Sequence, residues 1–292
     1  MMKTLDHSSI KALISLLEDP SEVIYNEIHQ TIIFLGDDGI PHLQTAFDES
    51  ESDLQKERIA QILDELKLAK LNKDLNNWKE FRSDDLLEGL LLIAKYGYPN
   101  FDKAEIEKTI NDMVAVLKDK LEGKTDVQIV HLLNQTILYD FGFNGNTHNY
   151  SAINNSFINK VFENRISNPI GLSVIYLLVA ERLNIPLVGI NSPGHFILGY
   201  VNEHFTKEGV TDGSVMRKVD FLVDPFNNGL MINNEDFDAL LSTIPYDLKD
   251  KDLLPATNVA IVKRVMNNLI HALFTTGEKS TAEELLNINE AL

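Results

Sequence analysis

Apolar residues recur at helical spacing through the first part of the chain, up to about residue 70. A first stripe covers residues 10–17 and ends at an Asp-Pro pair, and Ser21 is a suitable N-cap for the helix that follows. Pro41 begins a third helix, and a fourth covers residues 54–66. The pattern therefore predicts two helical hairpins in series.

Helical hairpins in series resemble HEAT-type repeats, and we assign residues 1–80 to a helical domain of this kind. Two such units are fewer than a free-standing solenoid usually needs, so we expect them to pack on the segment that follows. Stacked helical hairpins present extended surfaces to other molecules. We therefore expect this domain to contact a protein or peptide partner.

Beyond these helices the pattern of apolar positions changes. Three further helices are followed by a loop, residues 143–169, that is rich in Asn, Gly and Ser and contains a short helix. Residues 169–183 are apolar on nearly every face, which is typical of a buried helix. After Asn184 the period changes to that of strands, and a buried helix followed by antiparallel strands indicates an α+β core over residues 81–250. The last segment, residues 251–292, predicts a pair of helices.

The composition of the 292-residue chain excludes several classes of function. Its formal net charge of -18 argues against binding to nucleic acid or to an anionic membrane surface, because both need a basic face. The absence of cysteine excludes disulfides, thiolate metal sites and a cysteine nucleophile. The eight histidines show no metal-binding spacing, so we expect neither a metal site nor another cofactor. No apolar segment is long enough to span a bilayer and the N-terminus lacks a signal-peptide pattern, so we expect a cytoplasmic protein.

A single histidine, His195, follows a Pro-Gly turn and begins the apolar run HFILGYV. If the strands on either side of the next polar connection form a simple hairpin centred near Gly209-Val210, the residue opposite His195 is Asp224. A bulge would change this register. A carboxylate beside a histidine fixes its tautomer and stabilises its protonated form. The pair would therefore supply two of the three groups of a hydrolytic triad.

Three segments around this pair stand in the order NPIGLSVIYLLVAERLNIP, SPGHFILGY and VDPFNNG, and FGFNGN and NYSAINNSFINKVF precede them. Together they resemble the transglutaminase-like superfamily, and specifically a bacterial subgroup with a helical C-terminal extension. The resemblance covers about Leu86 to Leu240, and residues 251–292 are similar to a tetratricopeptide-type hairpin. It implies a papain-like core, with a nucleophile at the start of the buried helix and a His and an Asp on neighbouring strands. On this basis His195 and Asp224 match the family's His and Asp.

The family's cysteine nucleophile has no counterpart in this sequence. Its expected position falls at about Pro169 or Ile170, and neither side chain is a nucleophile. Ser173, about one turn further into the helix, or Ser167, just before it, could replace the cysteine, because a His–carboxylate pair can activate a serine. Ser173 lies in GLSVI, which has the first glycine of a nucleophile elbow but not the second. The alternative is that Ser173 hydrogen bonds within its own helix.

Two functions therefore remain open. The first is a non-catalytic transglutaminase-like protein with a degenerate Cys-His-Asp site, which acts as a binding or interaction module. The second is a hydrolase or acyltransferase that uses a serine nucleophile with the His195–Asp224 pair. Asn155, Asn168 and Tyr176 are candidates for contacts to a ligand, although for Tyr176 the sequence favours a satisfied core side chain. The His–Asp pair could also be a purely structural couple on adjoining strands.

Overall fold

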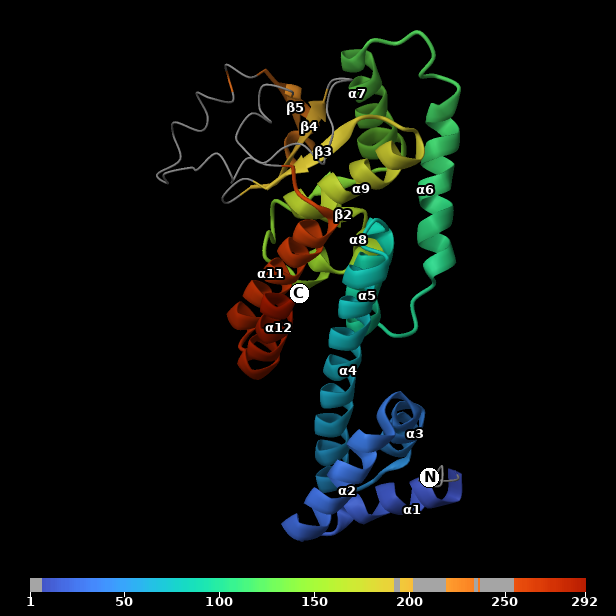
Figure 1. Ribbon diagram of the computed structural model, residues 1–292, viewed down its shortest axis with the longest axis vertical. Helices are drawn as coiled ribbons and strands as arrows, with labels where there is room; N and C mark the ends of the chain where they lie inside the picture. Colours follow the sequence, from blue (N-terminus) through green and yellow to red (C-terminus); the bar gives the residue numbers. More distant parts are fainter. Residues whose placement is uncertain (1–6, 192–194, 202–218, 234–235, 237–254) are drawn as a thin grey trace. The chain divides into compact units, whose positions relative to one another are not determined.

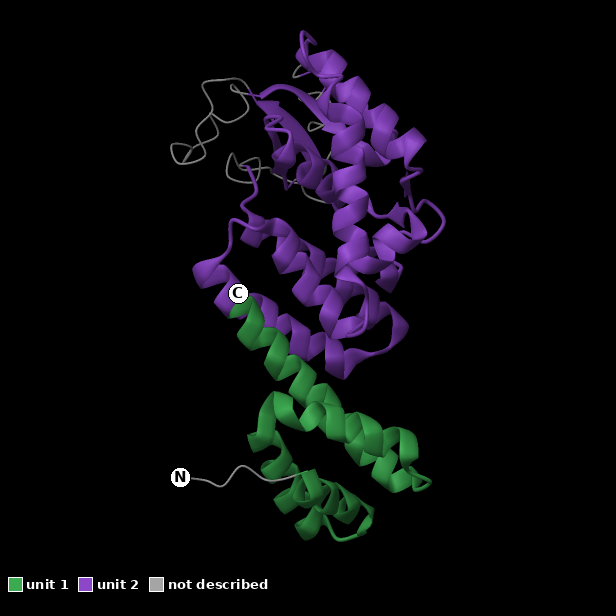
Figure 2. Ribbon diagram, turned by 90° about the vertical axis from the view of Figure 1, so that its right-hand side faces the viewer, with its two compact units in different colours: residues 1–76 green, residues 77–292 purple. Residues whose placement is uncertain are grey.

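The computed structural model of the chain describes residues 7–191, 195–201, 219–233, 236 and 255–292. The chain divides into two compact units, Met1–Asn76 and Asn77–Leu292, and the boundary falls inside one long helix, α4 (Asp53–Phe81) (Figure 2). The domain boundaries at residues 80 and 250 that the sequence suggests remain predictions. Of the helices in the described ranges, none combines the length and apolar character needed to cross a membrane.

The first unit is helical in the part of it that the structure describes. Before α4 come α1 (His7–Ser15), α2 (Glu22–Leu35) and α3 (Ile40–Glu49) (Figure 1). Ser21 caps α2 as predicted, since its Oγ accepts a hydrogen bond from the backbone N–H of Ile24. The core contains apolar side chains from these helices and the turns between them, including Leu17, Ile32, Leu43, Ile59 and Ile62. The four predicted helices are therefore present, while their relation to HEAT repeats remains a prediction.

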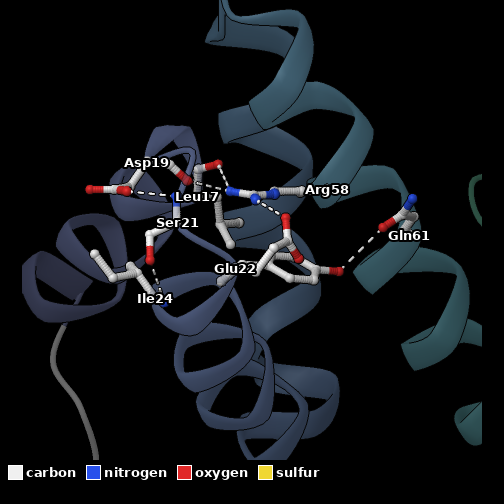
Figure 3. Close-up of polar contacts among 8 residues, drawn as sticks. Leu17, Asp19, Ser21, Glu22, Ile24, Arg58 and Gln61 are labelled. Atoms are coloured by element: carbon white, nitrogen blue, oxygen red, sulfur yellow. Dashed lines mark hydrogen bonds and ion pairs between the residues drawn. The ribbon is translucent and has the colours of Figure 1, made fainter.

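Arg58 fixes the turn between α1 and α2 from inside this unit (Figure 3). Its Nη1 donates to the backbone carbonyls of Leu17 at 3.2 Å and Asp19 at 2.5 Å, and its Nη2 donates to Glu22 Oε1 at 2.8 Å. The guanidinium carbon lies 4.5 Å from the centre of the Tyr25 ring. These contacts satisfy a buried cation, and they tie α4 to the turn that precedes α2.

The second unit is built around a buried helix. The helices α5 (Leu86–Gly97), α6 (Lys103–Lys118), α7 (Asp126–Asn134) and α8 (Ile158–Asn164) precede the buried helix α9 (Pro169–Arg182). Its residues are buried without a break from Pro169 to Tyr176, which confirms the predicted buried helix. Near the C-terminus, α11 (Asn258–Thr276) packs on α5 and α9, and α12 (Lys279–Ala291) packs on α11 (Figure 1).

A four-stranded antiparallel sheet follows α9 in the chain. Its strands stand in the order β3 (Leu187–Ile190), β4 (Ile197–Val201), β5 (Val219–Asp224) and β6 (Leu230–Ile232). A short parallel pair joins β1 (Asn144–Gly145) to β2 (Ile166–Ser167). The strands β3 and β4 contact α9. A buried helix against an antiparallel sheet is an α+β architecture, as the sequence predicted.

The register between β4 and β5 differs from the predicted one. A hairpin centred near Gly209-Val210, which lie outside the described residues, would pair Tyr200 with Val219. The observed partner of Tyr200 is Phe221, and a register irregularity separates this pair from the pair of Val201 with Val219. Beyond the irregularity the prediction was wrong by two residues, because alternating apolar positions do not reveal where a bulge inserts a residue. A shift of two keeps every side chain on its predicted face.

Candidate functional site

His195 and Asp224 lie at neighbouring ends of the two central strands. His195 stands just before β4, and Asp224 is the last residue of β5. Continuing the pairing beyond Leu198 and Val223 places Asp224 opposite Ile197, two residues from His195 and therefore on the same face. The contact is diagonal, and His195 Nε2 lies 2.8 Å from Asp224 Oδ2. The pairing predicted from the sequence is present, although the predicted register was not.

The Asp224 carboxylate is held by the turn that follows it. Its Oδ1 accepts hydrogen bonds from the backbone N–H of Phe226 at 3.1 Å and of Asn227 at 3.2 Å. The Asn227 side-chain amide donates to Oδ2 at 2.6 Å. Burial by itself would raise the pKa of Asp224, but the hydrogen bond and charge of His195 and the hydrogen bonds from Asn227 outweigh it and lower that pKa. Asp224 is therefore set up to remain an anion beside the imidazole.

The His195 side chain is accessible where its partner is not. It is 29% exposed, whereas the Asp224 side chain is 5% exposed. With the proton of Nε2 donated to the carboxylate, Nδ1 is the nitrogen through which His195 could accept a proton. Asp224 can thus orient the imidazole of His195 so that Nδ1 is free to accept a proton. A covalent reaction would further need a nucleophile within reach of this imidazole.

The start of α9 carries no such nucleophile. Asn168 caps the helix, since its Oδ1 accepts a hydrogen bond from Gly171 N at 3.0 Å, and Pro169 and Ile170 occupy the first turn. A side chain at position 171 is excluded, because a Cβ there would lie 1.9 Å from Ser167 Oγ. The three positions of the first turn therefore offer no group that could attack a carbonyl.

Ser167 and Ser173 are both fully buried, at 0% exposure. Ser167 Oγ donates to the backbone carbonyl of Asn155 at 3.1 Å, and Ser173 Oγ donates to that of Phe196 at 3.4 Å. The alternative that Ser173 bonds within its own helix was wrong, because its hydroxyl donates to the carbonyl of Phe196, the residue after His195. In the part of the chain that is described, neither hydroxyl is hydrogen-bonded to His195.

The three candidate binding residues hold parts of the fold together. Asn168 is the helix cap described above, and the Tyr176 hydroxyl donates to Asn134 Oδ1 at 2.8 Å. The Asn155 amide donates to the carbonyls of Asn149 and Tyr150 and accepts a hydrogen bond from Asn146. Each is at most 4% exposed. Contacts between these residues and a ligand remain predictions.

Asn227 and Asn134 are two polar residues that the sequence reasoning missed. Asn227 donates the remaining side-chain hydrogen bond to Asp224, and an Asp followed three residues later by Asn in DPFNN is a recognisable turn pattern that could have drawn attention to it. Asn134 gives no such signal, since its partners Tyr176 and Gly229 are remote in sequence. Among the described residues, no three His, Asp or Glu side chains gather as a metal site would need.

Comparison with known proteins adds to this geometry. A family model described as the transglutaminase-like superfamily matches residues 104–267, more than half of the chain. A UPF0162 protein from Xylella fastidiosa (strain 9a5c) is 31% identical over 199 residues, which are 65% of this chain and 64% of that protein. The match thus spans less than two thirds of that relative's length.

More distant relatives come from other organisms. The UPF0162 protein YchA from Escherichia coli (strain K12) is 24% identical over 219 residues, which are 73% of this chain and 74% of that protein. F-box only protein 21 from Mus musculus is 23% identical over 241 residues, which are 73% of this chain and 36% of that protein. No solved structure matches the chain significantly.

Proposed function

The chain belongs to the transglutaminase-like superfamily, and from that premise we propose that it is a non-catalytic member that acts as a binding protein. The observation that carries the proposal is the first turn of α9. This is where the family resemblance expects the nucleophile, and it holds Pro169, Ile170 and Gly171. The chain contains no cysteine that could act from another position.

The surroundings of the two serines support the same proposal. An attacking serine must expose its hydroxyl to the substrate and pass its proton to a base. Ser167 and Ser173 are each 0% exposed and donate to backbone carbonyls. To pass its proton to His195, either hydroxyl would have to give up its hydrogen bond to a backbone carbonyl. A serine hydrolase or acyltransferase is therefore our second candidate function.

Binding of a protein or peptide through the first unit is the second part of the proposal. The α2 helix of that unit exposes Val23 and Phe34, each at 70%. Large apolar side chains on a helix surface favour contact with another apolar surface. The partly exposed His195 imidazole in the second unit offers a polar group to a ligand of the degenerate site.

Turnover assays test the non-catalytic proposal. We expect the purified protein to show no activity on glutamine peptides with an amine donor, on p-nitrophenyl esters or on peptide amides, and no labelling by a fluorophosphonate that labels a control serine hydrolase. The variants His195→Ala, Ser167→Ala and Ser173→Ala should be indistinguishable from the wild type in all of these assays. Turnover or labelling that disappears in His195→Ala and in one serine variant would show that the protein is an enzyme.

A further inference from the structure

A cavity of about 550 Å³ lies in the second unit, apart from the His195–Asp224 pair. Its walls come from the end of α5, the loop that leads to α6, the first half of α6 and the helix α8. The helix α8 packs against both α5 and α6, and Figure 1 labels these three helices. The residues that line it fall within 97–165, so α9 and the four-stranded sheet do not contribute. A volume of this size is in the range of small-molecule sites.

Two residues that line this cavity each carry a buried side-chain polar atom without a partner. Asn159 is 8% exposed, and its Oδ1 accepts no hydrogen bond; Arg165 Nη1 is likewise buried and donates to no acceptor. Buried polar groups in folded proteins are nearly always paired, because an unpaired one loses its hydrogen bonds to water and gains no other hydrogen bond. The wall of the cavity therefore contains an unpaired acceptor and an unpaired charged donor.

The backbone of Arg165 has a conformation that is unfavourable for a residue with a side chain. It caps the end of α8 in the left-handed region, with φ 57° and ψ 24°, where glycine or asparagine is usual. Its N–H donates to Val161 O at 2.9 Å, and its carbonyl accepts from Asn144 N at 2.8 Å. The guanidinium lies 4.6 Å from the centre of the Phe143 ring. A strained residue with a fixed, desolvated cation is a common feature of binding sites.

The charges around Arg165 restrict the kind of ligand. The cavity's other cation, Lys160, is already paired with Glu163 at 2.6 Å and lies over the Tyr98 ring. Burial lowers the pKa of Arg165, and the negative charge of Glu105 opposes this shift. A bound anion would stabilise the buried cation further. The carboxylates of Asp102 and Glu105 also line the cavity and would repel a multiply charged anion such as a phosphate. A single carboxylate matches the planar guanidinium best.

We propose that this cavity binds an α-amino acid moiety: a carboxylate on Arg165, the neighbouring N–H on Asn159 Oδ1, and an apolar side chain against Ile106 and Phe162. The N–H can be the ammonium of a free amino acid or the last amide of a peptide with a free C-terminus. Both ligands share the carboxylate and the adjacent donor. This inference does not depend on whether the His195–Asp224 pair is catalytic.

A thermal-shift screen followed by calorimetric titration tests the proposal. The full-length protein is screened against the twenty L-amino acids, against a dipeptide set with free C-termini and against the same dipeptides with amidated C-termini. We expect a ligand with a free carboxylate to raise the melting temperature, since a ligand that binds only the folded state stabilises it, and we expect its amidated counterpart to have no effect. Binding of free amino acids alone, or of dipeptides alone, tells the two sources apart.

Three variants decide whether Arg165 and Asn159 make the contact. Arg165→Gly removes the guanidinium and relieves the left-handed backbone, so it should fold at least as well and bind the ligand about tenfold or more weakly. Asn159→Leu keeps the side-chain volume and should also weaken binding. Arg82→Ala removes a half-exposed arginine outside the cavity and should bind like the wild type. The proposal would be overturned if no amino acid and no dipeptide bound, or if Arg165→Gly bound the ligand as tightly as the wild type. Either result would hold whatever the turnover assays show.

Discussion

At the scale of single residues, Asp224 shows how one carboxylate serves both a turn and a histidine. It accepts four hydrogen bonds, one from His195, one from Phe226 N and two from Asn227. Three of these close the 3-10 turn Pro225–Asn227 and are independent of any substrate. The fold alone can therefore account for the burial of this anion, and a catalytic role is not needed to explain it.

Replacing Asp224 should reveal this structural role. We expect Asp224→Ala to lower the free energy of unfolding at pH 7 by about 1–3 kcal/mol, because it leaves buried N–H groups without an acceptor. Since the pKa of Asp224 is lowered in the folded state, its ionised form stabilises the protein above the unfolded-state pKa of about 3.9. That contribution is lost as the pH falls through the folded-state pKa. Urea unfolding from pH 7 down to pH 3 should show the gap between wild type and variant narrowing below about pH 4.

The exposed Asp220 on the same strand provides the control, and Asp220→Ala should change the free energy of unfolding by less than about 0.5 kcal/mol. A gap between wild type and Asp224→Ala that is the same at every pH would contradict the ionic part of the argument. Equal stability of the two proteins at pH 7 would contradict the structural role itself.

The residue types of the His–Asp pair could be predicted, while most of their neighbours could not. A histidine and an aspartate at the ends of apolar strands stand out in the sequence. The acceptor of Ser173 lies 23 residues away on another element, and no local pattern points to it. Arg165 occupies a position where glycine or asparagine is usual, so helix-end rules give no reason to look there.

At the scale of elements, Asn134 joins three parts of the second unit. Its Oδ1 accepts a hydrogen bond from the Tyr176 hydroxyl of α9, and its Nδ2 donates to the carbonyl of Gly229, just before β6, at 2.8 Å. Gly229 has a φ of +69°, and a Cβ there would lie 2.3 Å from the Asn134 amide. The end of α7, the buried helix and the last strand of the sheet are thus fixed to one another through a single amide.

Removing the Tyr176 hydroxyl tests this connection. We expect Tyr176→Phe to lower the free energy of unfolding by about 1–2 kcal/mol, because Asn134 Oδ1 then stays buried without a donor. The measurement is urea unfolding followed by circular dichroism. Tyr139→Phe removes a hydroxyl from a tyrosine that is 66% exposed and should be neutral within about 0.5 kcal/mol. If both variants are equally stable, the amide does not hold these elements together.

Elements with a strong period were predictable, and short or irregular ones were not. The all-round apolar character of residues 169–183 predicted a buried helix, and α9 is one. The strand β6 has three residues, too few to show an alternating pattern. The π-helix Gln135–Asp140 continues α7 with an apolar spacing close to that of an α-helix, so the two look alike in sequence.

At the scale of the whole molecule, each unit has a core of its own. The first unit buries apolar side chains from its helices around Leu17, Ile32 and Leu43. The second unit buries α9 between helices and the sheet. Two separate cores favour two separate unfolding transitions, because cooperativity follows the contacts that elements share.

Arg58 and Tyr176 allow these transitions to be assigned. We expect Arg58→Ala to destabilise the first unit by about 2–3 kcal/mol, because it removes the donor to the buried carbonyl of Leu17 and to the partly buried carbonyl of Asp19. Its pair with Glu22, which is 76% exposed, adds little. Calorimetry should show one transition lowered by roughly 8–24 °C and the other unmoved, and Tyr176→Phe should lower the other one. Lys11→Ala removes a cation that is 74% exposed in the same unit and should move neither. If Arg58→Ala shifts both transitions together, or a single transition is seen throughout, the two units unfold as one cooperative body.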